Sequence, residues 1–437
     1  MRRLLVLNAG SGSQKCSLFE LPGVLPDEPL NPVWEVKLDS TAPDQPDGQI
    51  AWQVCRRGEN IEAGTISRET SIAERSERLM SLLWSGPGAV VSGRGDIDAV
   101  AHRVVHGGSE FQNAVRVDAE VEATIERLAS FAPLHNPNNL TGIRVAREQF
   151  GPQTPQFAVF DTAFHHTLSA AAATYAGPYE WLDRGIRRYG FHGTSFRYAS
   201  DRAARLLERA HDPELRLILC HLGGGCSLCA TVGGRSIATT MGFTPLDGLP
   251  MCTRSGAVDP GILIYLLRQG SSADELETML NKASGLKGLS RLPGDTRVLI
   301  PAAERGDSHA RLALDVFIHG LRAGIGQMLA SLGNAPHAIV FTDAIGESEP
   351  SIRAAACAPF AFLHLHLDPQ ANAASHLDAD LATEASAVRV LLIKSREAWQ
   401  IARECHELLS GPQRRSERRA VRRSCHTSDQ HLWFGRE

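Results

Sequence analysis

Short apolar runs alternate along this chain with longer amphipathic stretches. Apolar runs bounded by turn residues predict buried strands, and apolar positions at helical spacing predict helices. Strands are expected within residues 4–21, 97–108, 157–168, 215–240, 337–348 and 388–393. Helices are expected over residues 69–84, 117–130, 138–149, 194–210, 260–269, 274–283, 300–331 and 396–409, the fourth of them with a Thr or Ser cap. This alternation predicts a protein of the α/β class.

One strand–turn–strand pattern occurs twice. In "LLVLNAGSGSQKCSLFEL" (4–21) and again in "LILCHLGGGCSLCATV" (217–232), an apolar strand ends in one polar residue, Asn8 or His221. A Gly-x-Gly turn and a second strand follow in both copies. The copies lie about half the chain apart, so a duplication would imply two similar domains that face each other. Coincidence of two glycine hairpins is the alternative.

The two turns suggest a phosphate site. A tight turn of small residues lets backbone N–H groups approach phosphate oxygens, and serine hydroxyl groups add donors. A Walker loop needs Gly-Lys-Ser/Thr at the start of a helix, whereas both turns continue into strands. We therefore expect two hairpins, one from each domain, to hold the phosphates of one nucleotide in a cleft.

Length, charge and targeting signals limit the possible partners. The chain has 437 residues, which is more than one ordinary core accommodates, so two domains are expected. The net charge is −4, so no overall basic field attracts nucleic acid. No apolar run reaches the roughly 18 residues that span a bilayer, and the apolar start is too short for a signal peptide. We expect a cytoplasmic protein that binds neither nucleic acid nor a membrane.

The nine cysteines are expected to be buried thiols, since disulfides are rare in the cytoplasm. Cys226 and Cys229 have the spacing of a redox or zinc pair. No second pair accompanies them and they lie in a strand-like run, so we interpret them as neighbours in a hairpin.

The C-terminal segment differs in composition from the rest of the chain. Residues 411–437 carry seven Arg against three acidic residues and show no apolar period. One interpretation is a basic arm for an anionic partner. A disordered, dispensable extension is favoured, so deleting residues 411–437 should leave activity unchanged.

Four residues in polar loops are candidates for site chemistry. Arg103 ends a buried strand, where a guanidinium group needs either a substrate anion or an internal salt bridge. Asp161 also follows a strand and could orient a nucleophile, hold a metal or cap a helix. His192 lies before a helix and is either a catalytic or a core histidine. Arg254 lies in a long loop, residues 245–261, and such loops are often functional.

Taken together, ten ordered motifs resemble the acetate and propionate kinase family, which belongs to the fold superfamily of sugar kinases, Hsp70 and actin. The motifs are "LVLNAGSGSQK", "AHRVVHGG", "PLHNPNN", "FAVFDTAFH", "RRYGFHGTS", "CHLGGG", "GFTPLDGLPMCTRSG", "SGLKGLS", "GDTR" and "EAWQIARE". The resemblance implies two facing domains of a duplicated actin-like, ribonuclease H-like fold with a central cleft. The implied parts are an N-terminal domain of residues 1–152, completed by the helix over 396–409, a C-terminal nucleotide and dimerisation domain of residues 153–393, and the tail 410–437.

The resemblance also implies a reaction and its catalytic residues. The reaction is phosphoryl transfer from ATP to acetate, reversibly giving acetyl phosphate and ADP, with Mg²⁺ or Mn²⁺, in a homodimer. Arg103 and Arg254 would clamp the carboxylate and the phosphoryl group, and His192 would donate to the transition state. Asp161 would position the acetate carboxylate or organise the metal rather than act as a base.

The remaining implied residues bind the metal, acetate and the nucleotide. Asn8 and Glu397 match the positions linked to Mg²⁺. The acetate site would be formed by Arg103, Val105, Leu134, Phe191 and Pro245. The nucleotide site would be formed by Ser11, Ser13, Lys15, His221, Leu222, Gly223, Gly224, Gly225, Asp295, Thr296, Arg297, Ala344, Ile345, Gly346, Glu347 and Ser348. A propionate-preferring kinase, a pyrophosphate-using kinase and a catalytically impaired nucleotide-binding homologue are the alternatives.

The chain departs from the family pattern in several places. Gly12 replaces a serine of the first turn, Gly224 and Cys226 replace Asn and Ser of the second, Phe196 replaces a His and Ala257 an Asp. The largest departure is "FTDAIGES" (341–348), where the family has a nucleotide-facing Thr-Gly-Gly-Ile-Gly-Glu-Asn loop. Asp343 and Ala344 there replace glycines, and an inward carboxylate at Asp343 would repel phosphate. We hypothesise weakened or altered nucleotide binding.

Overall fold

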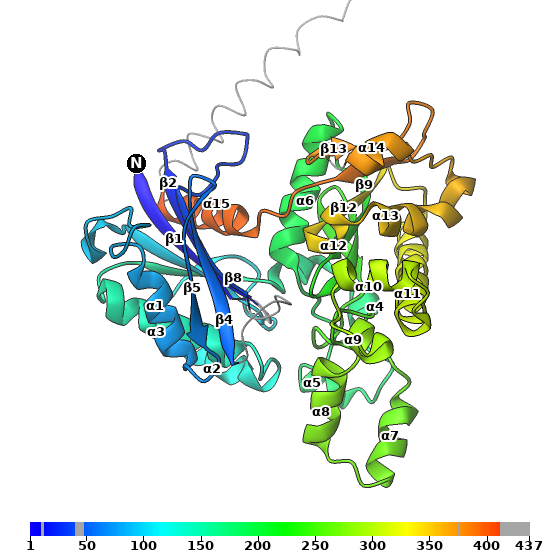
Figure 1. Ribbon diagram of the computed structural model, residues 1–437, viewed down its shortest axis with the longest axis horizontal. Helices are drawn as coiled ribbons and strands as arrows, with labels where there is room; N and C mark the ends of the chain where they lie inside the picture. Colours follow the sequence, from blue (N-terminus) through cyan, green and yellow to red (C-terminus); the bar gives the residue numbers. More distant parts are fainter. Residues whose placement is uncertain (10–12, 40–47, 375, 411–437) are drawn as a thin grey trace, which may run out of the picture.

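The computed structural model describes residues 1–9, 13–39, 48–374 and 376–410. Ser11 and the tail 411–437 therefore lie outside the described residues, as does the side chain of Ser13. Within the described chain, the strands form two sheets, and helices cover both faces of each (Figure 1).

The first sheet is built from the N-terminal part of the chain. Eight strands of the described residues form it in the order β5-β4-β3-β2-β1-β6-β8-β7. Their bounds are β1 Arg2–Ala9, β2 Ser13–Leu21, β3 Trp34–Asp39, β4 Gln49–Arg56, β5 Glu59–Ser67, β6 Ala99–Val104, β7 Val115–Arg116 and β8 Gln156–Phe160. The strands β1 to β5 pair antiparallel, whereas β1, β6 and β8 are parallel neighbours.

Side chains of the first sheet alternate between two helical layers. Leu5 packs toward α1 (Ile72–Ser81) and α3 (Asn136–Phe150), while Leu4 and Val6 pack toward α15 (Glu397–Leu409). This alternation is the two-residue period of a strand with both faces buried. Helix α2 (Ala119–Arg127) packs beside α3. Helix α15 thus joins the first sheet although it comes last in the described chain.

The second sheet repeats this design. Its described strands follow the order β11-β10-β9-β12-β14-β13. Their bounds are β9 Arg216–Leu222, β10 Cys226–Val232, β11 Arg235–Thr239, β12 Ala338–Thr342, β13 Ala379–Asp380 and β14 Arg389–Leu392. One face packs on α6 (Gly193–Leu206) and the other on α11 (Ser308–Leu332).

Both sheets therefore contain three antiparallel strands followed by two parallel ones, β3-β2-β1-β6-β8 and β11-β10-β9-β12-β14. The duplication expected from the repeated hairpin is confirmed. Helices α6 and α15 contact each other between the sheets, and one buried apolar cluster includes Phe196 of α6 and Trp399 of α15. This shared layer brings the ends of β1 and β9 toward one site.

Two helix predictions need correction. The helix expected over residues 300–331 is two helices, α10 (Thr296–Glu304) and α11. The chain breaks at Gly306, whose φ is +95°, and the Asp307 carboxylate caps α11 by accepting from the backbone N–H groups of His309 and Ala310. Helix α6 has no Thr or Ser cap: its N-cap residue is His192, in the left-handed conformation with φ 57°.

The remaining helices follow β8 along the chain. Their bounds are α4 Ala170–Ala173, α5 Glu180–Asp183, α7 Pro260–Arg268, α8 Ala273–Lys282, α9 Gly285–Ser290, α12 Asp343–Ser348, α13 Pro350–Cys357 and α14 Pro369–Ala374. Figure 1 shows α7 and α8 projecting away from both sheets. No helix of the described residues has the length and apolar character to cross a bilayer.

The prediction of buried thiols holds for six cysteines of the described chain, whereas Cys55 and Cys252 are half-buried. All eight cysteines of the described residues are free. Cys226 and Cys229 lie on β10, and burial raises the pKa of the Cys229 thiol to about 12. The described residues contain no group of three or more His, Cys, Asp or Glu side chains placed to hold a metal. The Cys-x-x-Cys spacing is a consequence of the hairpin.

Candidate active site

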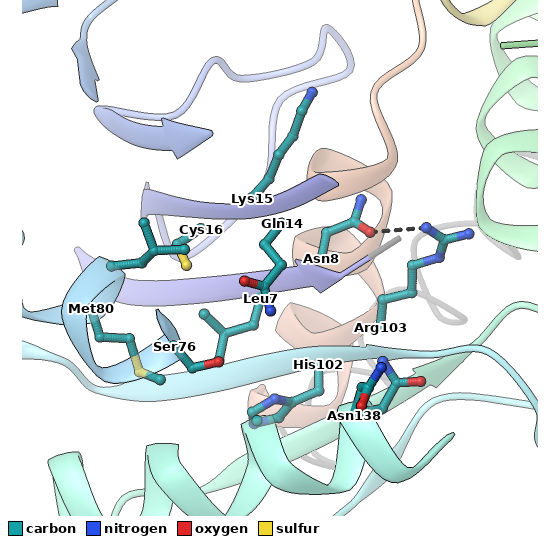
Figure 2. Close-up of a pocket in the computed structure, with 13 residues that line it drawn as sticks. Leu7, Asn8, Gln14, Lys15, Cys16, Ser76, Met80, His102, Arg103 and Asn138 are labelled. Carbon is teal, nitrogen blue, oxygen red and sulfur yellow. Dashed lines mark hydrogen bonds between the residues drawn. The ribbon is translucent and has the colours of Figure 1, made fainter. Parts of the chain in front are cut away.

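A buried charge cluster lies where the first sheet ends. Arg103 Nε lies 3.0 Å from both carboxylate oxygens of Asp161, and Arg103 Nη2 lies 2.5 Å from Asp161 Oδ2. Arg103 Nη1 donates to Asn8 Oδ1 over 3.1 Å (Figure 2). Asn8 Nδ2 donates to Glu397 Oε2 over 2.8 Å, and that oxygen is 3.7 Å from Arg103 Nη1. The parallel strands β1, β6 and β8 and the first residue of α15 thus bring four predicted residues together.

Burial sets the charges in this cluster. Burial alone would lower the pKa of the Arg103 guanidinium, but the carboxylates of Asp161 and Glu397 hold it above its ordinary value. Burial would raise the pKa of Glu397, yet Arg103 holds it below the ordinary glutamate value. For Asp161, burial is the larger influence and raises the pKa of the carboxyl group against the pull of Arg103. The internal salt bridge expected as one alternative for Arg103 is present.

A second cluster lies on the β9–β10 hairpin. The His192 ring stacks on the His221 ring with centroids 4.0 Å apart. His192 Nδ1 lies 2.8 Å from Ser227 Oγ on β10, and His221 Nδ1 lies 2.8 Å from Ser195 Oγ on α6. Burial, and after it the charges of His221, Arg103 and Arg254, lower the pKa of His192 well below the ordinary histidine value. His192 is therefore neutral near pH 7.

Arg254 lies against the same hairpin. A Cβ atom at Gly225 would lie 2.8 Å from Arg254 Nη2 and 3.1 Å from His192 Nε2, so this turn position has no room for a side chain. Arg254 Nη1 donates to the Pro245 carbonyl over 2.6 Å. Burial lowers the pKa of Arg254, but guanidinium groups remain protonated in proteins. The long loop thus delivers a cation to the second hairpin.

The charges of both guanidinium groups influence His135. Burial, then Arg254, then Arg103 lower its pKa to about 4, so both guanidinium groups act on this ring. Sequence reasoning quoted the motif "PLHNPNN" but assigned no role to His135, Ser195 or Ser227. His135 and Ser195 lie inside motifs of the family resemblance, and Ser227 lies inside the repeated hairpin pattern; these positions are the signals that could have identified them.

The residues expected around acetate are only partly enclosed. Val105 and Phe191 belong to one buried apolar cluster, and the Val105 N–H donates to Asn139 Oδ1 over 3.1 Å. Pro245 is half-buried beside Arg254. Leu134 is 41% exposed. The structure therefore brings Arg254 and Pro245 together, with Leu134 at the surface.

The nucleotide residues occupy four elements. Lys15 pairs across from Asn8 on the first hairpin, and Figure 2 shows its side chain extending away from the other labelled residues of a small pocket. Asp295 precedes α10 and accepts from the backbone of Arg297 over 2.9 Å. Thr296 Oγ1 donates to Glu349 Oε1 over 2.9 Å. Leu222 has a buried side chain, so only its backbone can face a ligand.

The segment "FTDAIGES" differs from the expected loop. Strand β12 ends at Thr342, and the next six residues form helix α12. In this helix Ile345 and Gly346 are buried, whereas Ala344 and Ser348 are exposed and joined by a 2.7 Å hydrogen bond from Ser348 Oγ to the Ala344 carbonyl. Glu347 Oε1 accepts from the backbone of Asp343 over 3.1 Å and of Ser395 over 2.7 Å.

The duplicated sheets with hairpins at a shared site define the class of the sugar kinase, Hsp70 and actin fold. Within that class, the chain belongs to the acetokinase family, whose sequence profile matches residues 3–403.

Relatives match over nearly the whole chain. The acetate kinase of Gloeobacter violaceus is 51% identical over 412 residues, covering 93% of this chain and 99% of that protein. The crystal structure of Porphyromonas gingivalis acetate kinase superimposes with a TM-score of 0.82 at 31% identity, covering 94% of this chain and 100% of that one. A propionate kinase from Francisella tularensis superimposes with a TM-score of 0.81 at 35% identity, covering 92% and 99%.

Proposed function

We propose that this chain is an acetate kinase, which transfers the γ-phosphoryl group of ATP directly and in line to the carboxylate of acetate and reversibly forms acetyl phosphate and ADP. One observation carries the proposal: Arg103, on β6 of the first sheet, contacts Asn8 and Asp161, while Arg254, from the loop over residues 245–261, lies against the Gly225 turn of the second sheet. Acetate and ATP are both anions. Two cations that meet between the sheets cancel their repulsion and hold them in line.

The residues have distinct roles in this proposal. Arg103 binds the acetate carboxylate, and its three contacts with Asp161 fix the guanidinium plane. Asp161 is thus a positioning residue, because acetate carries no proton to remove near pH 7. Arg254 stabilises charge on the equatorial oxygens of the phosphoryl group, and neutral His192 donates a hydrogen bond to the same group in the transition state.

The two hairpins would hold the polyphosphate. The backbone of the Gly223 to Gly225 turn would face the polyphosphate from the second sheet. From the first hairpin, Lys15 would supply positive charge, and Ser11 and Ser13 would supply hydroxyl donors. The adenosine would lie near Asp295, Thr296 and Arg297, with helix α12 alongside. Small residues at both turns support this arrangement because they allow close backbone approach.

Asn8 and Glu397 are suited to Mg²⁺. This ion prefers oxygen ligands and is often held by one or two carboxylates together with substrate phosphates. Glu397 supplies a carboxylate with a lowered pKa, and Asn8 supplies an amide oxygen, which accepts from Arg103 in the structure while the amide nitrogen faces Glu397. When bound, the ion would neutralise charge on the polyphosphate.

A small apolar pocket would select the acyl group. Val105, Leu134, Phe191 and Pro245 would surround the methyl group of acetate. One additional methylene is worth only about 1–3 kcal/mol of discrimination, so propionate should react more slowly rather than not at all.

A hydroxamate assay tests the function. Purified protein is incubated with Mg²⁺, hydroxylamine, one of acetate, propionate or butyrate, and either ATP or pyrophosphate. We expect acetyl hydroxamate with ATP and acetate at the highest kcat/KM. Protein that binds ATP but forms no acyl phosphate would instead be a nucleotide-binding homologue, and activity with pyrophosphate alone would reassign the donor.

We also propose how the chain is organised and where it acts. Residues 1–152 with α15 would form one domain and residues 153–393 the other. Helix α7 supports a homodimer formed through the second domain, because its apolar residues Ile262, Tyr265 and Leu267 are exposed. The free thiols support a cytoplasmic location, where disulfides are rare. Analytical ultracentrifugation of the wild type and of Tyr265→Ser tests the dimer.

A further inference from the structure

Asp343 directs its carboxylate at the second hairpin. It follows β12 directly and has a φ of 67°, in the left-handed region that few residues other than glycine occupy. Its Oδ2 atom lies 3.3 Å from Nε2 of His221, the last polar residue before the turn. The side chain is 32% exposed, whereas that of His221 is only 6% exposed. The partly exposed carboxylate therefore lies beside the deeply buried imidazole.

The carboxylate also lies on the turn itself. A Cβ atom built on Gly223 would be 1.8 Å from Asp343 Oδ2, which is far inside contact distance. Gly223 has an ordinary backbone φ, so the carboxylate rather than the backbone excludes a side chain there. The turn that would face phosphate thus has an oxygen anion of the same chain against it.

We propose that the Asp343 carboxylate occupies the phosphate subsite of the second hairpin in the empty protein, and that the polyphosphate of the nucleotide must displace it. This inference rests on the function proposed above. A carboxylate and a phosphate group accept hydrogen bonds from the same kinds of donor, and here both would face the His221 imidazole, while the Gly223 N–H donates to the Gly225 carbonyl. The two anions repel each other, so they do not share the subsite.

The surrounding charges fit an internal competitor. Arg103 is near enough for Asp343 to help raise the pKa of its guanidinium group, after the larger influences of burial and the two closer carboxylates. Burial raises the pKa of Glu347, and Asp343 adds to that rise. Asp343 thus lies between the cations of the site and a second acid. Leaving the hairpin exposes its carboxylate to solvent, which its partial exposure permits.

The expected effect follows from competition for one subsite. If the carboxylate holds the subsite about nine-tenths of the time, the apparent dissociation constant of the nucleotide rises about tenfold, because only the remaining molecules are competent to bind. Asp343→Asn and Asp343→Gly should therefore bind ATP about tenfold more tightly. Both residues tolerate a positive φ, so both variants should fold.

Calorimetric titration with ATP and with inorganic tripolyphosphate tests the proposal. Wild type, Asp343→Asn, Asp343→Gly and the control Asp315→Asn, an exposed acid on α11, are titrated with EDTA and again with Mg²⁺. We expect tighter binding of both ligands in the Asp343 variants, with the larger gain in EDTA, where the polyphosphate charge is not neutralised. The control should match the wild type.

Three results would overturn the inference. Unchanged binding in both variants would show that the carboxylate does not compete. Weaker binding only with Mg²⁺ would identify Asp343 as a metal ligand instead. Tighter tripolyphosphate binding without tighter ATP binding would place the contact outside the nucleotide site. Wild-type protein that binds neither ligand would instead contradict the proposed function, so the two failures are distinguishable.

A double-mutant cycle tests the contact without any ligand. Gly223→Ala adds the Cβ atom that meets Asp343 Oδ2, and it is made in the wild type and in Asp343→Gly. We expect Gly223→Ala to lower the midpoint of thermal unfolding in the wild type and to have a much smaller effect in Asp343→Gly. Equal losses in both backgrounds would show that the carboxylate does not lie on the turn.

Discussion

Five strands of each sheet follow the same order, but the corresponding strand ends carry opposite chemistry. In the first, β1 pairs with β6 at Leu7 and His102, and the next residue, Arg103, reaches Asn8. In the second, β9 pairs with β12 at His221 and Thr342, and the next residue, Asp343, reaches His221. The guanidinium group of Arg103 thus reaches from β6 to β1 in the first sheet, whereas the carboxylate of Asp343 reaches from the end of β12 to β9 in the second.

This difference separates two tasks. The cation of the first copy is fixed by buried acids, which gives it one orientation and suits it to bind a reacting carboxylate. The second copy offers a glycine turn with a partly exposed acid over it, which suits reversible binding of a polyphosphate. A duplicated fold therefore supplies position, and the residues at its strand ends supply the chemistry.

Removing the cation of the first copy should have the largest effect. Arg103→Ala leaves Asp161 and Glu397 buried without their partner, which should lower the free energy of unfolding by about 3–5 kcal/mol. It should also lower kcat/KM for acetate about 10²-fold or more, because the acetate carboxylate loses the cation that binds it and holds it in line with the phosphoryl group. Urea unfolding and the hydroxamate assay measure the two effects.

Two controls separate these losses. Arg103→Lys keeps the charge without the fork-shaped contact to Asp161, so its losses should be intermediate. Arg127→Ala breaks an exposed pair with Glu110 and should change stability by less than about 1 kcal/mol. A stable, fully active Arg103→Ala variant would show that the strand ends of the first sheet have no catalytic role that distinguishes them from those of the second.

Substitution of His192, which precedes α6 and stacks on His221 of the second sheet, should have the next largest effect on activity. His192→Ala removes the neutral donor that faces the Gly225 turn, and kcat should fall about 10²- to 10³-fold with little change in KM for either substrate. His165 is a matched control because it is buried and bonds to Ser236 on β11 and to the Phe191 carbonyl. His165→Gln should lower stability more than kcat. The opposite ranking would make His192 a structural residue.

Much of the fold was predictable because its signals are local. The repeated strand–turn–strand pattern of Asn8 and His221 predicted the duplicated sheets without knowledge of any contact. Strands β7 and β13 were not predictable, since each has two residues and forms only by pairing with a neighbour. Helix α10 was merged with α11 in the prediction, although the polar run over residues 304–309 interrupts the apolar spacing at Gly306.

The site was predictable as a set of residues but not as an arrangement. Motifs named Arg103, Asp161 and His192, yet their partners depend on strand ends that meet only in the folded chain. The reciprocal bonds of Ser195 to His221 and of Ser227 to His192 join α6 to β9 and β10, and no pattern within one segment encodes them. The direction of Asp343 depends on its positive φ, which the residue type alone does not reveal.

Acid should weaken both copies at once. His102 beside Gln156 in the first sheet and His165 beside Ser236 at the second have pKa values lowered to about 4 by burial. The unfolded chain binds these protons near pH 6.5 and the folded chain does not, so stability falls as pH falls from 6.5 toward 4, by about 1.4 kcal/mol per unit for each histidine. Thermal unfolding between pH 7 and 5 measures this.

His102→Gln isolates one of these groups. This variant should fold, and the decrease in its free energy of unfolding with falling pH should be smaller by about 1.4 kcal/mol per pH unit, the contribution of one histidine. Stability that is flat between pH 7 and 5 would mean that the histidines are not hidden from solvent. Two separate unfolding transitions in acid would show that the parts of the chain around the first and second sheets unfold independently.

The smallest expected effects are the most selective test of the two tasks. Ser227→Ala removes the oxygen 2.8 Å from His192 Nδ1, and Ser195→Ala removes the oxygen 2.8 Å from His221 Nδ1. Each loss should lower the free energy of unfolding by about 1 kcal/mol.

Because His192 is proposed to act on the transition state and His221 on the nucleotide, Ser227→Ala should lower kcat several-fold, whereas Ser195→Ala should raise KM for ATP and leave kcat unchanged. Steady-state kinetics at saturating acetate distinguish these patterns, and Ser→Thr at either position should restore the lost parameter. If both alanine variants changed the same parameter, the stacked rings of His192 and His221 would act as one unit. The proposed separation of a transition-state role from a nucleotide-binding role would then be wrong.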